Sequence, residues 1–261
     1  MRLTWVLFWL LAFAAQPAAA QSPLASQVQN QLAMLVTSKS ADVGIAAIDL
    51  ATGETVSVRG DQRYPMASTM KIAVAATYLS YVENGERSLD ETIGGQSAAS
   101  LMKAMMVRSD NRATDLLLRN LGGPRTVQKW LEWHNVEGIR VDRTIAQLLR
   151  AKRDLYENED STTPLAFAQF LRRLDKGELL KPWGRTYLFN LMAQCKTGTL
   201  NGYSSDVGFI TLPNGHKVAI AIFARGGSDR PRAIAEVARA VYDGFRTVIG
   251  WPYNAASTLT Q

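Results

Sequence analysis

The sequence predicts an α+β fold, an antiparallel sheet flanked by N- and C-terminal helices, with an inserted all-α lobe. One hairpin pattern near each end of the chain and a long helical pattern between them lead to this expectation. The 261 residues are 47% hydrophobic and 20% charged, ordinary globular values that exclude disordered, coiled-coil and collagen-like chains. We expect one domain over 21–261, with a sheet lobe at about 24–60 plus 196–250 and a helical lobe at about 68–195.

The first twenty residues are expected to be a signal peptide. Met1 and Arg2 give a positive start, an apolar stretch follows to Ala15, and Ala18–Ala20 supply the small residues that a signal peptidase recognises. The apolar stretch is short for a bilayer core of about 30 Å, so a membrane anchor made from it is the less favoured alternative. We therefore expect cleavage before Gln21 and export to the periplasm without a membrane anchor.

Two hairpins supply the strands of the predicted sheet. Apolar, β-branched segments on either side of Ala51-Thr52-Gly53-Glu54 predict the first hairpin. The second is centred on Pro213-Asn214-Gly215, because Asn-Gly is the dipeptide most typical of tight hairpin turns. The four strands are expected at 43–50, 55–59, 206–212 and 217–224.

The spacing of apolar residues predicts helices in the remaining segments. Val28, Leu32 and Val36 recur at helical spacing within 25–37, and Ile234, Val237 and Val241 do so within 232–248. From Ser68 to about Lys181 the pattern is helical, interrupted by glycine- and proline-containing turns. The terminal helices are expected to cover the sheet, leaving a cleft between it and the helical lobe where ligands usually bind.

The composition excludes several classes of site. Cysteine occurs once, at Cys195, and histidine only at His134 and His216, so no Cys/His zinc site, iron–sulfur cluster or internal disulfide is expected. We expect no metal and no cofactor. The net charge of +6 is spread among acidic residues without a basic run, which disfavours a nucleic-acid partner. The expected partner is a small molecule, and the expected state is a monomer.

Ser68 and Lys71 are the first candidate catalytic pair. The chain has no Gly-x-Ser-x-Gly motif, and two histidines leave few options for a Ser-His-Asp triad. Residues three apart on a helix share a face, so Lys71 can reach the Ser68 hydroxyl and, in a dry cleft beside other cations, act as a base. A nucleophile at the first turn of a helix also has backbone N–H groups aimed at a developing oxyanion.

Two further motifs follow in the chain. Ser109-Asp110-Asn111 lies between two amphipathic helical stretches, and Lys196-Thr197-Gly198-Thr199 precedes the last hairpin. A strand with lysine, threonine and glycine at the edge of a cleft offers a cation, a hydroxyl and an open backbone edge to a substrate carboxylate and amide.

These motifs resemble those of class A β-lactamases and, more broadly, of the penicillin-recognising serine hydrolases, whose motif set is S-x-x-K, S-D-N and K-T-G. The resemblance extends over nearly the whole mature chain. Its segments are MASTMK at 66–71, SDN at 109–111, LLLRNLGGP at 116–124, DSTTP at 160–164, the KTGT strand and the closing helix.

The resemblance implies a role for each motif residue. Ser68 would be the acylated nucleophile, Lys71 its activating partner, and Ser109 the relay of a proton to the leaving nitrogen. Asn111 would shape the wall around Lys71 and the substrate amide. The substrate carboxylate would be held by Lys196, Thr197 and Thr199 along the strand that contains Gly198, and the oxyanion by the N–H groups of Ser68 and Thr199.

The chain departs from the family in the loop that normally reads Asp-Arg-Trp-Glu-x-x-x-Asn, because residues 142–149 are DRTIAQLL. The loop-closing pair is retained as Arg143 and Asp160. Ile145 stands where the family has the glutamate that activates the deacylating water, and Leu149 where it has the asparagine that helps hold this water. An isoleucine cannot position or deprotonate water.

Other groups near these motifs have open roles. Glu157 and Glu159 are candidates for a replacement base, although both are expected to face solvent. Arg225, Arg230 and Arg232 are candidates for a carboxylate clamp, with a surface ion pair as the favoured alternative for each. The first and second motif serines are only 41 positions apart, so one wall of the cleft is expected to be trimmed. The K-T-G triplet directly follows a helical run at 185–194. The alternative to a genuine K-T-G motif is that these residues are the remnant of a helical turn fused to the strand.

Three functions remain open from the sequence. The first is a β-lactamase that opens the lactam amide through an ester on Ser68. The second is a D-alanyl-D-alanine peptidase or slow penicillin binder that uses the same residues on a D-Ala-D-Ala-type peptide. The third, of a different class, is a non-hydrolytic sensor of cell-wall peptide or β-lactam. The missing loop glutamate favours the second and third, whereas the overall likeness and single-domain size favour the first.

Overall fold

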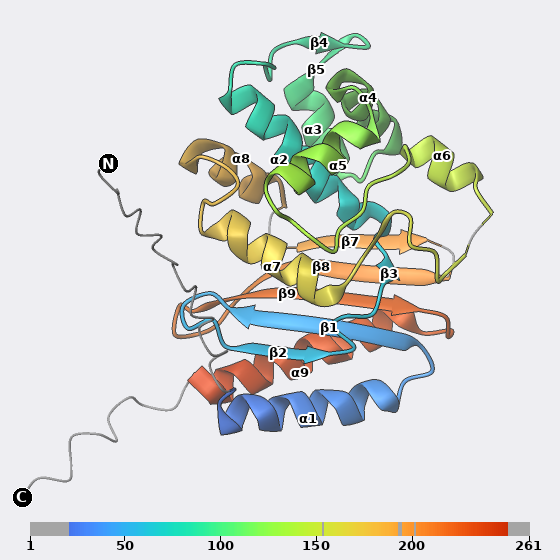
Figure 1. The fold of residues 1–261 in the computed structure, drawn as a ribbon. Helices are drawn as coiled ribbons and strands as arrows, with labels where there is room; N and C mark the ends of the chain where they lie inside the picture. The colour runs from blue at the N-terminus through green and yellow to red at the C-terminus, as the bar shows by residue number, and fades with distance from the viewer. Residues whose placement is uncertain (1–20, 153, 193–194, 201, 250–261) are drawn as a thin grey trace, which may run out of the picture.

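The computed structural model describes residues 21–152, 154–192, 195–200 and 202–249, so the predicted signal peptide at 1–20 lies outside the described residues. Its centre is an antiparallel five-stranded sheet in the order β2-β1-β9-β8-β7 (Figure 1). The strands are β1 (Asp42–Asp49), β2 (Thr55–Val58), β7 (Cys195–Leu200), β8 (Tyr203–Thr211) and β9 (Lys217–Arg225). The predicted fold class and both predicted hairpins are confirmed.

Two terminal helices cover one face of this sheet, as predicted. The helix α1 (Pro23–Thr37) starts where the Ser22 hydroxyl accepts a hydrogen bond from Ala25 N, and it packs beside α9 (Arg230–Ile249). Figure 1 shows both helices below the sheet. Their apolar stripes and the strand residues facing them form one core cluster. This burial explains the apolar spacing in both segments.

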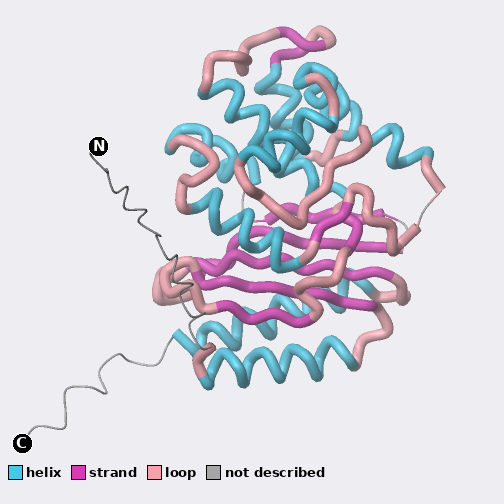
Figure 2. Tube along the Cα trace, in the orientation of Figure 1, coloured by secondary structure: helices cyan, strands magenta, loops and turns pink. Residues whose placement is uncertain are grey.

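The remaining helices lie on the opposite side of the sheet (Figure 1). The helix α7 (Pro164–Asp175) lies on β1 and β9. Above it are α2 (Met70–Glu83), α3 (Ala98–Val107), α4 (Asn111–Leu121), α5 (Pro124–Trp133), α6 (Ile145–Arg150) and α8 (Pro182–Met192). Figure 2 shows the helical layer over the strands.

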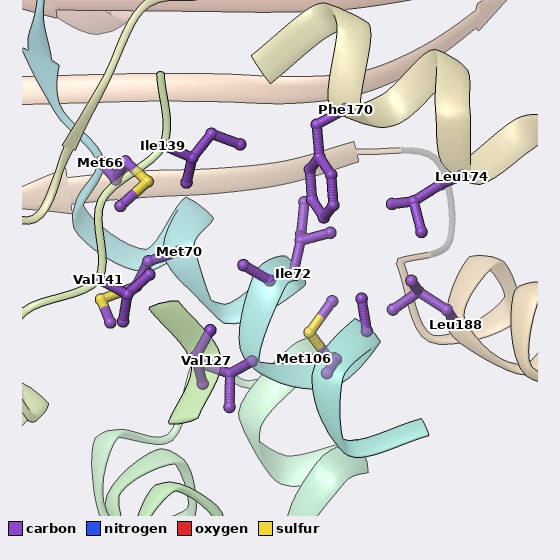
Figure 3. Close-up of a cluster of buried hydrophobic side chains, with 14 of the residues drawn as sticks. Met66, Met70, Ile72, Met106, Val127, Ile139, Val141, Phe170, Leu174 and Leu188 are labelled. Atoms are coloured by element: carbon purple, nitrogen blue, oxygen red, sulfur yellow. The ribbon is translucent and has the colours of Figure 1, made fainter. Parts of the chain in front are cut away.

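The helix α2 is the centre of this helical part. Its residues are buried without interruption from Met70 to Ser80. A helix that is apolar on nearly all sides is stable only when other elements surround it. Figure 3 shows Met70 and Ile72 among side chains from other elements, including Val127 and Phe170. Ser68 therefore stands at the end of the most deeply packed helix, which is a rigid base for a reactive group.

Two short ladders were not predicted. One joins β3 (Tyr64–Pro65) to β6 (Ser161–Thr162), and the other joins β4 (Thr92–Ile93) to β5 (Gln96–Ser97). The first ladder ties the segment before Ser68 to the end of the 142–160 loop, and Met66 N adds a hydrogen bond to the Asp160 carbonyl at 3.0 Å. Two-residue strands carry too little alternation to be recognised in a sequence.

The Lys-Thr-Gly segment is a strand of the main sheet. The helix α8 ends at Met192, and Cys195 already pairs with Gly208 of β8. The triplet 196–198 therefore has the backbone conformation of a strand. Among the described residues, no helix is both long and apolar enough to cross a membrane.

Candidate active site

Ser68 lies in a tight turn at the start of the central helix. The 3₁₀ turn Ala67–Thr69 runs directly into α2. Ala67 has a φ of 50°, a left-handed conformation that costs energy for any residue other than glycine. Thr69 Oγ1 donates to the Met66 carbonyl at 2.6 Å. The half-buried Ser68 is thus held at the N-terminal end of α2, where backbone N–H groups lack helical partners.

A chain of hydrogen bonds connects Ser68 to Lys71. The Ser109 hydroxyl donates to Ser68 Oγ at 2.9 Å, and Lys71 Nζ donates to Ser109 Oγ at 3.0 Å. Lys71 is fully buried, and its ammonium also donates to the Ser109 carbonyl at 2.7 Å and to Asn111 Oδ1 at 2.8 Å. Two of the three motifs predicted to form the site therefore meet at the nucleophile.

The turn between α3 and α4 brings the second motif to this place. Ser109 has a φ of 55°, so the chain reverses sharply after α3. Asp110 then caps α4, because its carboxylate accepts a hydrogen bond from Ala113 N at 2.8 Å. The cap fixes the first residue of α4, Asn111, whose side-chain oxygen reaches Lys71.

The strand β7 passes close to the backbone of Ser68. A Cβ atom on the buried Gly198 would lie 3.0 Å from Ser68 N, so a larger residue would push the strand away. Ser205 on β8, directly opposite Gly198, donates to the Met66 carbonyl at 3.2 Å. Thr199, the next residue of β7, lines the same cavity as Ser68. The third motif thus runs beside Ser68 and contributes Thr199 to the lining of the cavity.

A cavity of about 230 Å³ opens at these residues. Its polar side is formed by Ser68, Ser109, Asn111 and Thr199, and its apolar side includes Ile145, Leu148 and Leu149, with Ala67 completing the lining. Ile145 and Leu148 are buried, and Leu149 is partly exposed. Among the described residues that line the cavity, none is acidic.

The loop that carries these apolar residues is closed at its neck by Arg143. The guanidinium donates to Asp160 and, at 2.6 Å, to Glu157 Oε1. Burial would lower the pKa of Arg143, but its hydrogen bonds to Glu157 and Asp160 raise that pKa above its usual value. Glu157 is therefore engaged as an ion-pair partner and does not line the cavity; it is half-buried, so the prediction that it faces solvent is wrong, whereas Glu159 is exposed, as predicted.

Asp115 holds the N-terminus of α6 over the cavity. This buried residue of α4 accepts hydrogen bonds from Ile145 N at 2.7 Å and from Ala146 N at 2.9 Å. Thr144 caps the same helix through Gln147 N. A carboxylate at a helix N-terminus satisfies free N–H groups and complements the helix dipole.

We expect Asp115→Ala to lower the melting temperature by about 2–8 °C. The two N–H groups would lose their acceptor, a cost of about 1–2 kcal/mol, and each kcal/mol shifts a domain of this size by about 2–4 °C. Thermal unfolding monitored by circular dichroism measures this loss. Asp115→Asn retains one acceptor oxygen and should lose less; equal losses in the two variants would show that the carboxylate does not act as this cap.

The candidate arginines do not enter the cavity. Arg232 pairs with Glu236 at 2.8 Å on the surface of α9, and Arg230 donates to the Gly226 carbonyl at 3.1 Å. Arg225 is buried and pairs with Asp42. Lys196 lies in β7 opposite Val207, and Thr197 follows it opposite Asp206. The predicted contacts of Lys196 and Thr197 with a substrate carboxylate stay predictions.

Asp115, Leu148 and Ser205 were not predicted as site residues from the sequence. The signal for Asp115 is a lone carboxylate among the buried positions of the amphipathic segment 113–121. Leu148 lies one turn after Ile145 and therefore shares its face of α6. Ser205 has no local signal, because its importance comes only from its register opposite Gly198.

Comparisons with known proteins agree with this fold. A model of the β-lactamase enzyme family matches residues 24–195 and 193–245. A β-lactamase from Streptomyces fradiae is 33% identical over 209 residues, which are 71% of this chain and 68% of that protein. The β-lactamase CTX-M-8 from Citrobacter amalonaticus is 32% identical over 206 residues, 72% of this chain and 69% of that protein.

Solved structures show the same relationship. The ancestral class A β-lactamase designated GNCA superimposes with a TM-score of 0.77 and 31% sequence identity, covering 84% of this chain and 100% of that chain. The fold is therefore that of the class A β-lactamases. This chain belongs to the β-lactamase enzyme family.

Proposed function

We propose that this protein is a serine β-lactamase that opens the β-lactam amide through an ester on Ser68. The observation that carries the proposal is the hydrogen-bonded chain from Ser68 through Ser109 to the buried Lys71, facing a cavity beside β7. A hydroxyl linked to a buried amine can lose its proton as it attacks a carbonyl. Membership of the family supports the same reaction.

The residues divide the acylation step between them. The Lys71 ammonium first releases a proton to solvent, and Ser68 Oγ then attacks the lactam carbonyl carbon while its own proton passes to the resulting neutral amine. The N–H groups of Ser68 and Thr199 stabilise the oxyanion. As the ring C–N bond breaks, the proton returns through the Ser109 hydroxyl to the lactam nitrogen, and the acyl group remains as an ester on Ser68.

The strand β7 and the α4 terminus are proposed to hold the substrate. Lys196 and Thr197 would pair with its carboxylate, Gly198 permits the close approach of the strand, and Thr199 and Asn111 would contact its amide. Charge-assisted hydrogen bonds from such groups orient a carboxylate strongly.

Slow release of the ester is the second part of the proposal. Ile145 and Leu149 occupy the loop positions where the family has its deacylating glutamate and an asparagine, and the described lining of the cavity is apolar on that side. An ester on Ser68 would face Ile145 and Leu148 rather than a base. The same observation favours a penicillin-binding or D-Ala-D-Ala peptidase-like activity as the second candidate, since both share the acylation step, and a non-hydrolytic sensor would retain the ester indefinitely.

Incubation with a penicillin followed by tryptic mapping tests the acylation step. We expect the adduct on the peptide of residues 64–71, which lies between Arg63 and Lys71 and contains Ser68. Thr69, the other hydroxyl near it, is fully buried and donates to Met66. A modified peptide elsewhere, with 64–71 unmodified, would contradict the assignment of Ser68.

We also propose export to the periplasm with cleavage after Ala20, leaving residues 21–261 as the mature domain. The leader pattern supports it, and so do the contacts at the new terminus, where Gln21 Nε2 donates to the Thr55 carbonyl and Ser22 N to Glu54. N-terminal sequencing of protein released by osmotic shock should read Gln21 first. Recovery in the membrane fraction with Met1 retained would instead indicate an anchor.

A further inference from the structure

Arg225, the last residue of β9, makes contacts that the proposed catalytic mechanism does not use. It is only 8% exposed. Its Nε donates to Asp42 Oδ2 at 2.8 Å, and its Nη1 donates to the Arg63 carbonyl at 2.7 Å. One face of the guanidinium lies 4.6 Å from the centroid of the Tyr64 ring. The sheet therefore fixes this cation in one orientation.

The segment 154–159, called the distal loop below, packs on this cation. The Tyr156 ring centroid lies 4.1 Å from the Arg225 guanidinium carbon, and the Leu155 carbonyl accepts a weak hydrogen bond from Nη1 at 3.4 Å. Leu155 also packs against Gly202 at the start of β8, where a Cβ atom would lie 2.9 Å from Leu155 Cδ2. Figure 1 shows the chain after α6 running to this end of β7 and β8.

We propose that Arg225 and Tyr156 form a latch that keeps the distal loop on the sheet and thereby keeps α6 closed over Ser68. Arg225 and Tyr156 are positioning residues, because neither lines the cavity. The latch is separate from the Arg143–Asp160 neck of the loop and from the Asp115 cap of α6. The effect on turnover rests on the proposed acyl-enzyme; the attachment itself does not.

The latch affects the cavity at Ser68 because of its position in the chain after α6. Asp115 fixes only the first residues of α6, whereas Leu148 and Leu149 lie at its C-terminal end, which continues into the distal loop. These two leucines cover the cavity beside Ser68. A loop that leaves the sheet more often would uncover this side of the cavity more often and admit water to the ester.

Tyr156 is the position at which the latch can be tested without damage to the fold. Tyr156 is 68% exposed, whereas removal of Arg225 would take away one ion-pair partner of the Asp42 carboxylate. Tyr156→Leu retains apolar bulk but removes the aromatic face that attracts a cation. Tyr156→Phe retains that face and is the matched control.

Hydrogen–deuterium exchange of peptides covering 154–159 is the first readout, and it does not depend on any activity. We expect exchange in Tyr156→Leu to be about two- to fivefold faster than in the wild type, the range that an exposed cation–π contact implies, and exchange in Tyr156→Phe to be unchanged. Equal exchange in all three proteins, or equally faster exchange in both variants, would overturn the latch.

Release of a bound β-lactam, followed by intact mass, is the second readout. We expect loss of the adduct to be about two- to fivefold faster in Tyr156→Leu, with the rate of adduct formation and the behaviour of Tyr156→Phe unchanged. Faster exchange with unchanged release would overturn the control of the site by the loop. If no adduct forms in any protein, the proposed function fails, while the exchange result still decides whether the attachment exists.

Discussion

Ser68→Ala is expected to abolish covalent labelling by β-lactams. The variant removes the only atom in the proposed mechanism that forms the ester, and loss of a serine nucleophile costs on the order of 10⁶-fold in turnover in well-studied serine hydrolases. Intact mass spectrometry after incubation with a penicillin should show the unmodified mass alone. Steady hydrolysis of a chromogenic cephalosporin should fall to the background of the buffer.

The fold of this variant should be intact. Ser68 is half-buried and its hydroxyl accepts one hydrogen bond, from Ser109. A change of this kind shifts the free energy of unfolding by about 0.5 kcal/mol or less. Ser40→Ala, at an exposed serine between α1 and β1, is the matched control and should label like the wild type. A labelled Ser68→Ala protein would mean that another residue is the nucleophile.

Ile145→Glu combined with Leu149→Asn is expected to accelerate release of the acyl group. The pair restores a carboxylate and an amide beside the ester, and general-base assistance typically contributes about 10²–10⁴-fold. Asp115 accepts hydrogen bonds from the N–H groups of residues 145 and 146, so burial and the nearby Asp115 charge would raise the pKa of a carboxylate at position 145 and make it a stronger base. Pre-steady-state kinetics should show a faster slow phase and an almost unchanged burst rate.

A matched double variant distinguishes the effect of the new carboxylate from the effect of easier access for water. Ile145→Gln with Leu149→Asn has nearly the same size and polarity but no carboxylate. It should accelerate release far less than the glutamate variant. Equal acceleration by both would show that access of water limits the reaction, rather than the lack of a base. Thermal unfolding of both proteins controls for the cost of a polar group at the buried Ile145.

The main features of the fold could be predicted because they are local. The Asn214-Gly215 turn specifies its hairpin, with Gly215 at a φ of 84°, and the apolar stripe of α1 specifies its buried face. The strand β8 was predicted to begin at 206, whereas it begins at Tyr203, which pairs with Arg225. That extension depends on a partner strand rather than on the composition of residues 203–205.

Only those residues of the candidate site that belong to the sequence motifs could be predicted. Ser68, Lys71 and Ser109 were predicted to act together and are joined by hydrogen bonds. The contacts of Asp115 with α6 and of Arg225 with Tyr156 span 30 and 69 positions of the chain. Such long-range pairs cannot be predicted from local periodicity, because only the folded chain brings their members together.

Time-resolved intact mass spectrometry of the wild-type protein with a chromogenic cephalosporin is the most direct test of the central claim, that an ester on Ser68 forms readily and is released slowly. We expect a burst of product close in amplitude to the enzyme concentration, and one acyl adduct per chain that persists through the slow phase. Rapid turnover with no burst and no trapped adduct would contradict it, because another group would then activate the deacylating water and the loop at Ile145 would not limit release.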